Sequence, residues 1–267
     1  MEILGYIGAV LMGLSLGLIG GGGSILTVPI LVYLFQVDAV LATAYSLFIV
    51  GLTSLIGSFS HLRLGNIHWL TAMVFGIPSI IAVFLTRAYL VPALPDPLFS
   101  IGSTAISKSL GVLIFFALLM VAAAYSMIRR QKKGGEATPG EVKFNYPLIL
   151  GEGIVVGTIT GLVGAGGGFL IIPALVLLAK LPMKQAVGTS LIIIAAKSLI
   201  GFTGDLHGNE VIDWNFLMIF SAIAIGGILV GSILSKRIPN EKLKPAFGWF
   251  VLVMGLYIIG KELSAMA

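Results

Sequence analysis

The sequence has no cysteine and few charged residues. Without cysteine among its 267 residues, the chain cannot form disulfides, thiolate metal sites or cysteine-ligated iron–sulfur clusters. Charged residues make up 10% of the chain, whereas about one quarter is usual in soluble domains. Hydrophobic residues make up 58%, and the mean hydropathy is +1.08. Apolar runs of about 20 residues recur from end to end, so the composition predicts a polytopic membrane protein.

Metal ligands and catalytic groups are also scarce. The three histidines lie at the ends of expected helices and no acidic cluster joins them, so we expect neither a metal ion nor a cofactor. The net charge of +5 could suggest a nucleic acid partner. In a membrane chain it indicates topology instead, because Lys and Arg gather in cytoplasmic loops. Glu2 stands where a signal peptide would be basic, so we expect no cleaved signal.

The chain contains two copies of one unit, offset by 144 residues. The stretch "GLIGGGGSILTVPILVYL" from Gly17 aligns with "GLVGAGGGFLIIPALVLL" from Gly161. The alignment also pairs Pro29 with Pro173, Ser46 with Ser190, Ser54 with Ser198 and Gly57 with Gly201, and after one residue of slip Trp69 with Trp214. Internal repeats of this kind are common in transporters. We therefore expect a first membrane repeat at 1–128, an exposed cytoplasmic linker at 129–143 and a second membrane repeat at 144–267.

Each repeat begins with an apolar segment that glycines interrupt. The two broken segments cover 4–35 and 145–180. As one straight helix, each would be roughly 48 Å long, far beyond the ~30 Å hydrocarbon core. Such a segment could tilt strongly, or it could fold back at its glycines as a re-entrant hairpin, which needs protein or a water-filled cavity around it. We expect the remaining helices at 39–60, 69–90, 107–128, 183–204, 214–236 and 242–262, and a loop at 91–106.

The distribution of basic residues favours the hairpin. If both broken segments crossed the membrane fully, the basic residues would divide almost evenly between its two sides. If both turn back, the second repeat is inverted, and one side collects Arg63, Arg129, Arg130, Lys132, Lys133, Lys143, Lys180, Lys184, Lys236, Arg237, Lys242 and Lys244. The other side then holds only Arg87, Lys108 and Lys261. Because positive residues concentrate in the cytoplasm, we expect an all-α polytopic fold of two inverted repeats, each a re-entrant hairpin plus three transmembrane helices, with both termini outside the cytoplasmic membrane.

The two glycine runs predict an anion site. Each return leg, 24–35 or 169–180, is about 17 Å of helix, so the two hairpin tips reach the middle of the bilayer. A helix N-terminus at each tip offers unpaired backbone N–H groups and a positive dipole end. The predicted binding residues here are Gly21, Gly22, Gly23, Ser24, Gly166, Gly167 and Gly168. Close helix packing is the alternative, and it is the one we favour for Gly13, Gly17, Gly153, Gly157, Gly161, Gly227 and Gly231.

The helix after each hairpin adds polar candidates. Lys197 is the only basic residue deep inside an apolar span, so its side chain should face the bundle interior and have a partner. That partner is either a substrate anion or a structural group such as Glu152. Glu152 is also a candidate for proton coupling, or a residue hydrated at the membrane interface. On the same helical face as Lys197 we expect Ser190, and the matching positions of the first repeat are Ser46 and Thr53. His61, Arg63, Asp205 and His207 lie at equivalent helix ends and are either gating residues or ordinary interface residues.

These motifs resemble the TauE/SafE (TSUP) family of sulfite and organosulfonate exporters. The resemblance rests on "GLIGGGGSILTVPIL" (17–31), "GLVGAGGGFLIIPAL" (161–175) and "AVGTSLIIIAAKSLIG" (186–201), with Asp205 downstream. It implies transport of a small inorganic or organosulfur anion such as sulfite, thiosulfate or a sulfonate. We expect a secondary transporter that works by alternating access in the inner membrane, with a proton as the candidate coupling ion. One alternative is a passive anion-selective channel. Another is an intramembrane enzyme, which the sequence disfavours because it shows no nucleophile–base pair.

The topology gives a first testable expectation. A reporter domain fused after Ala267 should be active only outside the cytoplasm, because the inverted arrangement places both termini there. The measurement is the activity of paired reporters that work on opposite sides of the membrane. A cytoplasmic reporter signal would contradict the inverted arrangement.

Overall fold

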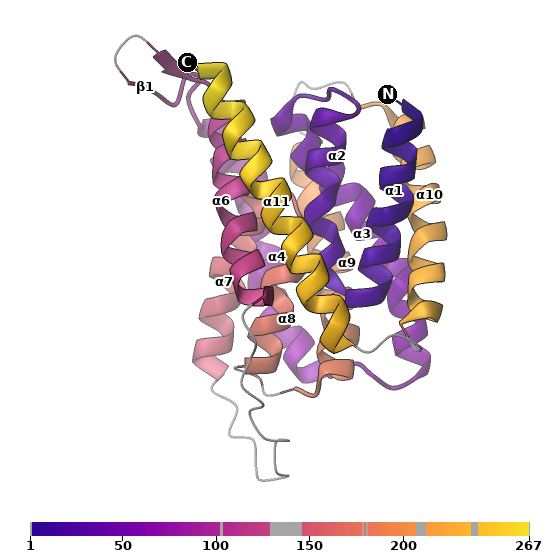
Figure 1. The fold of residues 1–267 in the computed structure, drawn as a ribbon. Coiled ribbons are helices and arrows are strands. Elements are labelled where there is room, and N and C mark those ends of the chain that lie inside the picture. Colours follow the sequence, from indigo (N-terminus) through magenta and orange to yellow (C-terminus); the bar gives the residue numbers. More distant parts are fainter. Residues whose placement is uncertain are drawn as a thin grey trace.

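The protein folds into a bundle of helices. The computed structural model describes residues 2–101, 104–128, 146–177, 179, 181–206, 212–235 and 240–266 (Figure 1). Six of its helices are long and apolar enough to cross a membrane. The protein is therefore an all-α polytopic membrane protein, as predicted. The predicted linker at 129–143 lies outside the described residues.

Among the described residues, the first half of the chain contains six α-helices. They are α1 (Glu2–Ile19), α2 (Thr27–Tyr33), α3 (Ala39–Arg63), α4 (Trp69–Leu85), α5 (Val91–Ala93) and α6 (Lys108–Ile128). A 3₁₀-helix, η1 (Gly21–Leu26), joins α1 to α2, and a π-helical turn, η2 (Thr86–Leu90), joins α4 to α5. Asp38 starts α3, because its carboxylate accepts hydrogen bonds from the Val40 and Leu41 N–H groups at 2.8 and 3.3 Å.

In the described part of the second half there are five α-helices. They are α7 (Tyr146–Val163), α8 (Gly168–Leu177), α9 (Met183–Asp205), α10 (Trp214–Leu234) and α11 (Asn240–Met266). Asp213 starts α10 in the same way that Asp38 starts α3, by accepting from the Phe216 N–H at 3.0 Å. Glycines with positive φ separate the paired helices: Gly20 (77°) follows α1, and Gly164 (71°) follows α7. The interruptions therefore fall where the glycine runs predicted them.

The segment 91–106 differs from the expected loop. Its start continues α4 through η2 and α5, since Pro92 occupies the first turn of α5, where a missing N–H is tolerated. Its end forms a two-stranded antiparallel sheet of β1 (Phe99–Ile101) and β2 (Thr104–Ile106), with Phe99 opposite Ile106. Strands of three residues are too short to produce an alternating sequence pattern, so the composition of the segment indicated only a loop.

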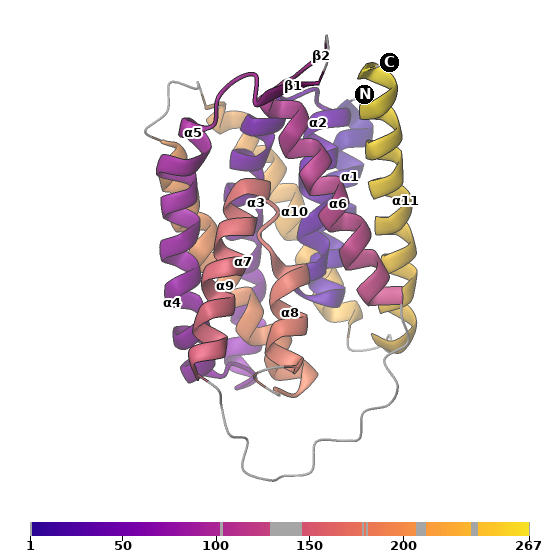
Figure 2. The ribbon, with the colours of Figure 1, turned by 90° about the vertical axis from the view of Figure 1, so that its left-hand side faces the viewer.

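The chain path is visible in two orthogonal views (Figures 1 and 2). From the end of the bundle where both termini lie, α1 runs toward the middle and α2 returns to the same end. From the opposite end, where α6 finishes and α7 begins, α7 runs toward the middle and α8 returns. We call these the termini end and the linker end.

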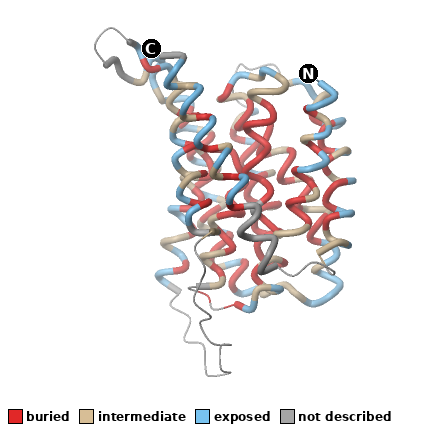
Figure 3. The backbone as a smooth tube through the Cα atoms, in the orientation of Figure 1, coloured by how far each residue is buried: buried red, intermediate tan, exposed pale blue. Residues whose placement is uncertain are grey.

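Two helices form the centre of the bundle. In α3 and α9, 67% of the residues in the 18-residue apolar stretch that could span a membrane are buried. The corresponding share is only 39% in α1, α6 and α10. Figure 3 shows the buried residues gathered in the interior and the exposed ones on the outer helices. A Cβ on Gly51 of α3 would lie 3.0 Å from the backbone nitrogen of Leu199 in α9. The two helices therefore cross in close contact near the middle of the molecule.

Small residues bring the outer pairs together in matching ways. A Cβ on Gly13 would clash with the carbonyl oxygen of Ala224, so α1 packs directly on α10. A Cβ on Gly157 would lie 2.5 Å from the carbonyl oxygen of Ser79, so α7 packs equally closely on α4. Gly13 and Gly157 are equivalent in the sequence alignment, as are Ser79 and Ala224. Small residues allow this approach of two helix backbones.

Adjacent glycines in α10 provide a test of this packing. A Cβ on Gly227 would lie 2.5 Å from the carbonyl oxygen of Val10, whereas a Cβ on Gly226 meets nothing within 4 Å. We expect Gly227→Ala to lower the thermal unfolding midpoint in detergent, because overpacking costs about 1–3 kcal/mol. Gly226→Ala is the matched control and should leave the midpoint unchanged or raise it, since alanine is the better helix former. Equal midpoints for the two variants would refute the close contact of α1 and α10.

Candidate functional site

The two glycine-rich tips meet directly. A Cβ built on Gly21 would clash with the backbone of Gly168, and a Cβ on Gly168 would clash with the backbone of Gly21. Only two glycines allow the backbones to approach so closely. The structure thus shows a packed contact between η1 and the start of α8.

The first tip forms a tight turn. After Gly20 the chain continues as the 3₁₀-helix η1 before α2 begins. The hydroxyl of Ser24 donates to the carbonyl oxygen of Gly21 at 2.8 Å, and Ser24 is fully buried. This hydrogen bond stabilises the turn. The hydroxyl oxygen of Ser24 can still act as a hydrogen-bond acceptor. Gly22 lies in the same turn, and Gly23 packs against the backbone of Leu16.

The second tip depends on left-handed backbone. Gly166 and Gly167 have φ values of 62° and 67°, which side chains other than glycine rarely adopt. The carbonyl oxygen of Gly167 accepts from the N–H groups of Leu170 and Ile171, both at 3.0 Å, and so starts α8. The first N–H groups of a helix have no partner within it. The start of α8 at Gly168 therefore presents the positive end of the helix dipole at the tip.

Lys197 lies against this second tip. Its side chain is fully buried, and its Nζ donates to the Thr160 hydroxyl at 2.9 Å. A Cβ on Gly167 would lie 2.7 Å from that Nζ, so the amine sits beside the tip backbone. Lys197 has no ion-pair partner among the described residues. The buried amine thus has the neutral Thr160 hydroxyl as its only hydrogen-bond partner among the described residues.

Glu152 does not pair with Lys197. It lies on α7, eight residues before Thr160, which is about 12 Å along the helix. Its side chain is half-buried and forms no ion pair within the described ranges. The expected structural partner of Lys197, Glu152, is therefore wrong. The structure shows Thr160 as the hydrogen-bond partner of the amine instead. Glu152 as a coupling residue stays a prediction.

The hydroxyl groups predicted on α3 and α9 are all buried. Thr53 donates to the Ile49 carbonyl at 2.6 Å and Ser190 to the Val187 carbonyl at 2.8 Å, so both bond within their own helices. The Ser46 hydroxyl has no hydrogen-bond partner among the described atoms. Ser46 lies between Thr43, which packs against Gly164, and Val50, which packs against Gly166. Its helix face therefore lies on the second tip, where the hydroxyl is free to serve a ligand.

A buried ion pair between Arg87 and Asp205 lies near the second tip, and the sequence did not predict it. The Arg87 Nη2 lies 2.7 Å from Asp205 Oδ1, and Nε donates to Oδ2 at 2.8 Å. Nη1 donates to the Thr43 hydroxyl at 2.8 Å and to the Gly161 carbonyl at 3.2 Å. The Arg87 side chain is fully buried, whereas the sequence indicated only the side of the membrane on which this residue lies. The available signal was weak: Arg87 is flanked by apolar residues, and Asp205 lies at the same end of the bundle.

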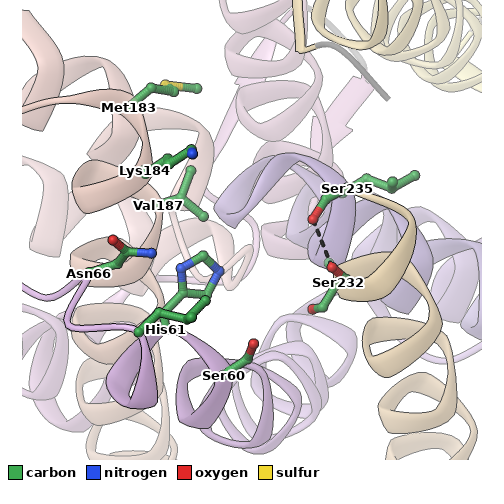
Figure 4. A pocket seen from close by; sticks show the side chains of 11 residues that line it. Ser60, His61, Asn66, Met183, Lys184, Val187, Ser232 and Ser235 are labelled. Carbon is green, nitrogen blue, oxygen red and sulfur yellow. Dashed lines mark hydrogen bonds between the residues drawn. The ribbon is translucent and has the colours of Figure 1, made fainter. Parts of the chain in front are cut away.

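A cavity of 520 Å³ opens at the linker end. It lies between the ends of α1, α3 and α10 and the start of α9. Figure 4 shows His61, Asn66 and Lys184 on one wall and Ser232 and Ser235 on the facing wall. Its lining residues are Gly17, Leu18, Ser60, His61, Leu64, Asn66, Met183, Lys184, Val187, Ser232 and Ser235. Of the four helix-end residues named in the sequence, only His61 lines it; Arg63 is exposed nearby, Asp205 pairs with Arg87, and His207 lies outside the described residues.

The chain is similar to a family of membrane transporters over almost its whole length. Residues 6–258 match the family model described as "Sulfite exporter TauE/SafE". A probable membrane transporter protein of Xylella fastidiosa strain Temecula1 is 29% identical over 265 residues, which cover 96% of this chain and 94% of the relative. Probable membrane transporter proteins of Methanocaldococcus jannaschii (28% identity, 96% and 93% covered) and Bacillus subtilis (YunE; 26%, 96% and 98%) are also similar. No solved structure gives a significant match.

The Arg87–Asp205 pair generates a stability prediction. Asp205→Ala should reduce the free energy of unfolding by roughly 3–5 kcal/mol, because it leaves the Arg87 guanidinium buried without a counter-charge. The double variant Arg87→Met, Asp205→Leu should recover much of that loss, since well-packed apolar residues often replace a buried pair at little cost. Thermal unfolding in detergent measures both, and Asp213→Ala, which removes only a helix cap, is the control at about 1 kcal/mol. A double variant no more stable than Asp205→Ala would contradict the role of the uncompensated charge.

Proposed function

Because the chain belongs to the sulfite exporter TauE/SafE family of membrane transporters, we propose that it is a secondary transporter of small sulfur-containing oxyanions. The observation that carries this proposal is Lys197, a fully buried amine beside a helix N-terminus without an ion-pair partner among the described residues. A charge in the interior of a membrane protein is costly and marks a substrate or ion pathway. Sulfite, thiosulfate and sulfonates each present several oxygen acceptors on a small negative body.

We propose that the two halves are inverted repeats with re-entrant hairpins. The path of α1 and α2 from the termini end, and of α7 and α8 from the linker end, supports this arrangement. So does the equivalence of the Gly13–Ala224 and Gly157–Ser79 contacts. In this arrangement the linker end, with its basic residues, faces the cytoplasm, and both termini lie outside the inner membrane.

The anion binds where the tips meet. The Lys197 amine supplies the charge, and the backbone N–H groups at the start of α8 supply further donors, as at other helix N-termini that bind anions. The free hydroxyl of Ser46 and the backbone of Gly21 lie on the other sides of the second tip. Since Gly21 and Gly168 are packed together, the tips must separate for the anion to enter. We infer that the structure represents a state in which the central site is closed.

Alternating access explains why such a site is built from two similar halves. Two repeats of opposite orientation have two equivalent packings, one open to each side, around a fixed central site. The packed tips favour this mechanism over the alternative of a passive anion-selective channel, because a channel needs a continuous open path. Glu152, half-buried and unpaired among the described residues, is the proposed group for proton coupling.

Anion flux into proteoliposomes tests the function. Wild type should transport at least one of sulfite, thiosulfate and a sulfonate with saturable kinetics, and a pH gradient should change the rate. Lys197→Met should reduce this flux at least tenfold, because it removes the central charge but keeps the side chain's length and apolar stem.

Lys108→Met, at the start of α6, is the matched control and should transport like wild type. Normal flux by Lys197→Met would remove Lys197 from the binding site. A flux that rises linearly with anion concentration and ignores the pH gradient would favour the channel.

A further inference from the structure

We propose that the cavity at the linker end is the vestibule through which the anion reaches the tips, and that the Arg87–Asp205 pair is the closed gate at the equivalent place of the termini end. The inference rests on the proposed transport function. It assigns a ligand class, a small oxyanion, to the cavity and a role to an ion pair that the central site does not use.

The two places are equivalent in the sequence. Arg87 and the three residues that its guanidinium contacts have counterparts in the alignment of the two repeats. All four counterparts line the cavity. At the offset of 144 residues, or 145 after the slip, the pairs are Gly161 with Gly17, Thr43 with Val187, Asp205 with His61, and Arg87 with Ser232.

The two places are also equivalent in their packing. Gly164, at the second tip, packs against Thr43, and its counterpart Gly20, at the first tip, packs against Val187. Gly201 packs against Val83, and their counterparts Gly57 and Ile228 pack together in the same way at the other end. The backbone framework is thus repeated, and the difference between the two places lies in their side chains.

At the termini end the side chains close the space. The Arg87 guanidinium makes a bidentate contact with Asp205 and also reaches α3 and α7 through Thr43 and Gly161. It therefore connects α9, α3 and α7 to the helical extension of α4. The helices cannot separate here unless these charge-assisted hydrogen bonds break.

At the linker end the space stays open. Ser232 is too short to replace Arg87, and His61 carries no fixed negative charge to attract a guanidinium. The Nδ1 atom of His61 has no hydrogen-bond partner among the described residues. Lys184 adds a positive charge, and none of the eleven lining residues is Asp or Glu. The polar groups of the cavity are the ring nitrogens of His61, the Asn66 amide, the serine hydroxyls and the Lys184 amine. Because the lining has hydrogen-bond donors and no carboxylate, it suits a small oxyanion and disfavours a cation.

The cavity leads to the central site. Val187 lines the cavity and packs against Gly20, and Gly17 and Leu18 form the end of α1 just before the first tip. The first tip in turn contacts the second tip, beside which Lys197 lies. This chain of contacts places the packed tips between the cavity and Lys197. Release toward the termini end requires the Arg87–Asp205 contacts to open.

The absence of cysteine allows a direct test, because each introduced thiol is the only one in the chain. Ser232→Cys places a thiol in the cavity. Ser46→Cys places one behind the ion pair, at a fully buried hydroxyl without a hydrogen-bond partner among the described residues. Each variant is reconstituted in a known orientation and treated from either side with an anionic, membrane-impermeant methanethiosulfonate.

We expect Ser232→Cys to react from the linker end at least tenfold faster than Ser46→Cys reacts from the termini end. Sulfate should slow the reaction of Ser232→Cys, whereas chloride at the same ionic strength should not, and Lys184→Met should abolish this protection. In the Ser46→Cys background, Asp205→Asn should raise labelling from the termini end at least tenfold. The double change Arg87→Gln, Asp205→Asn should do the same without a buried unpaired charge, which guards against misfolding.

Rapid labelling of Ser46→Cys with the ion pair intact would overturn the gate. Failure of sulfate to protect Ser232→Cys would overturn the vestibule. Both results are separable from the transport proposal, which depends on the flux of wild type and Lys197→Met. Normal flux combined with either labelling failure leaves the transporter and removes the inferred gate or vestibule.

Discussion

The contact between the backbones of Gly21 and Gly168 governs the centre of this molecule. Two helices are interrupted in the bundle interior, and their free backbone groups must be satisfied or covered by protein. Each tip covers the other, so neither interruption faces lipid. The same contact brings the start of α8 next to Lys197, so a buried amine and the positive end of a helix dipole lie together in the bundle interior.

The two halves have similar backbones and matching glycine contacts near the centre of the bundle, but they differ in their polar side chains. Lys197 corresponds to Thr53 in the alignment, and Thr160, whose hydroxyl accepts the hydrogen bond from the Lys197 amine, corresponds to Leu16. The amine and its hydrogen-bond partner therefore lie in the second half of the chain, whereas the first half has a threonine and a leucine at the matching positions. The Arg87–Asp205 pair has Ser232 and His61 as its counterparts, so its closing interaction also exists only once among the described residues. A repeated framework gives two related packings, and these unpaired substitutions make them unequal.

Features that depend on local sequence could be predicted, and features that depend on helix crossings could not. The breaks at Gly20 and Gly164 follow from glycine runs inside segments too long for one span. The burial of Lys197 follows from its position in an apolar helix. The partner of Lys197 did not follow, because charge pointed to Glu152 whereas helix geometry placed Thr160 opposite the amine. The Arg87–Asp205 pair joins residues 118 positions apart on different helices, and no periodicity encodes that meeting.

In the proposed transport cycle, the difference between the two ends of the bundle has an energetic consequence. An alternating mechanism works best when its two states differ by only a few kcal/mol, because a larger gap leaves one state too rare. A buried bidentate pair is costly to break while both charges stay away from water, so it biases the chain toward closure at the termini end. Opening that end therefore needs compensation, and hydration of Arg87 and Asp205 in a newly opened cavity supplies part of it. The oxyanion supplies more if it contacts Arg87 on its way out, since a guanidinium binds an oxyanion with the same fork geometry as a carboxylate. The interaction that closes the path can thus be exchanged for one with the substrate, which couples opening to the presence of the anion.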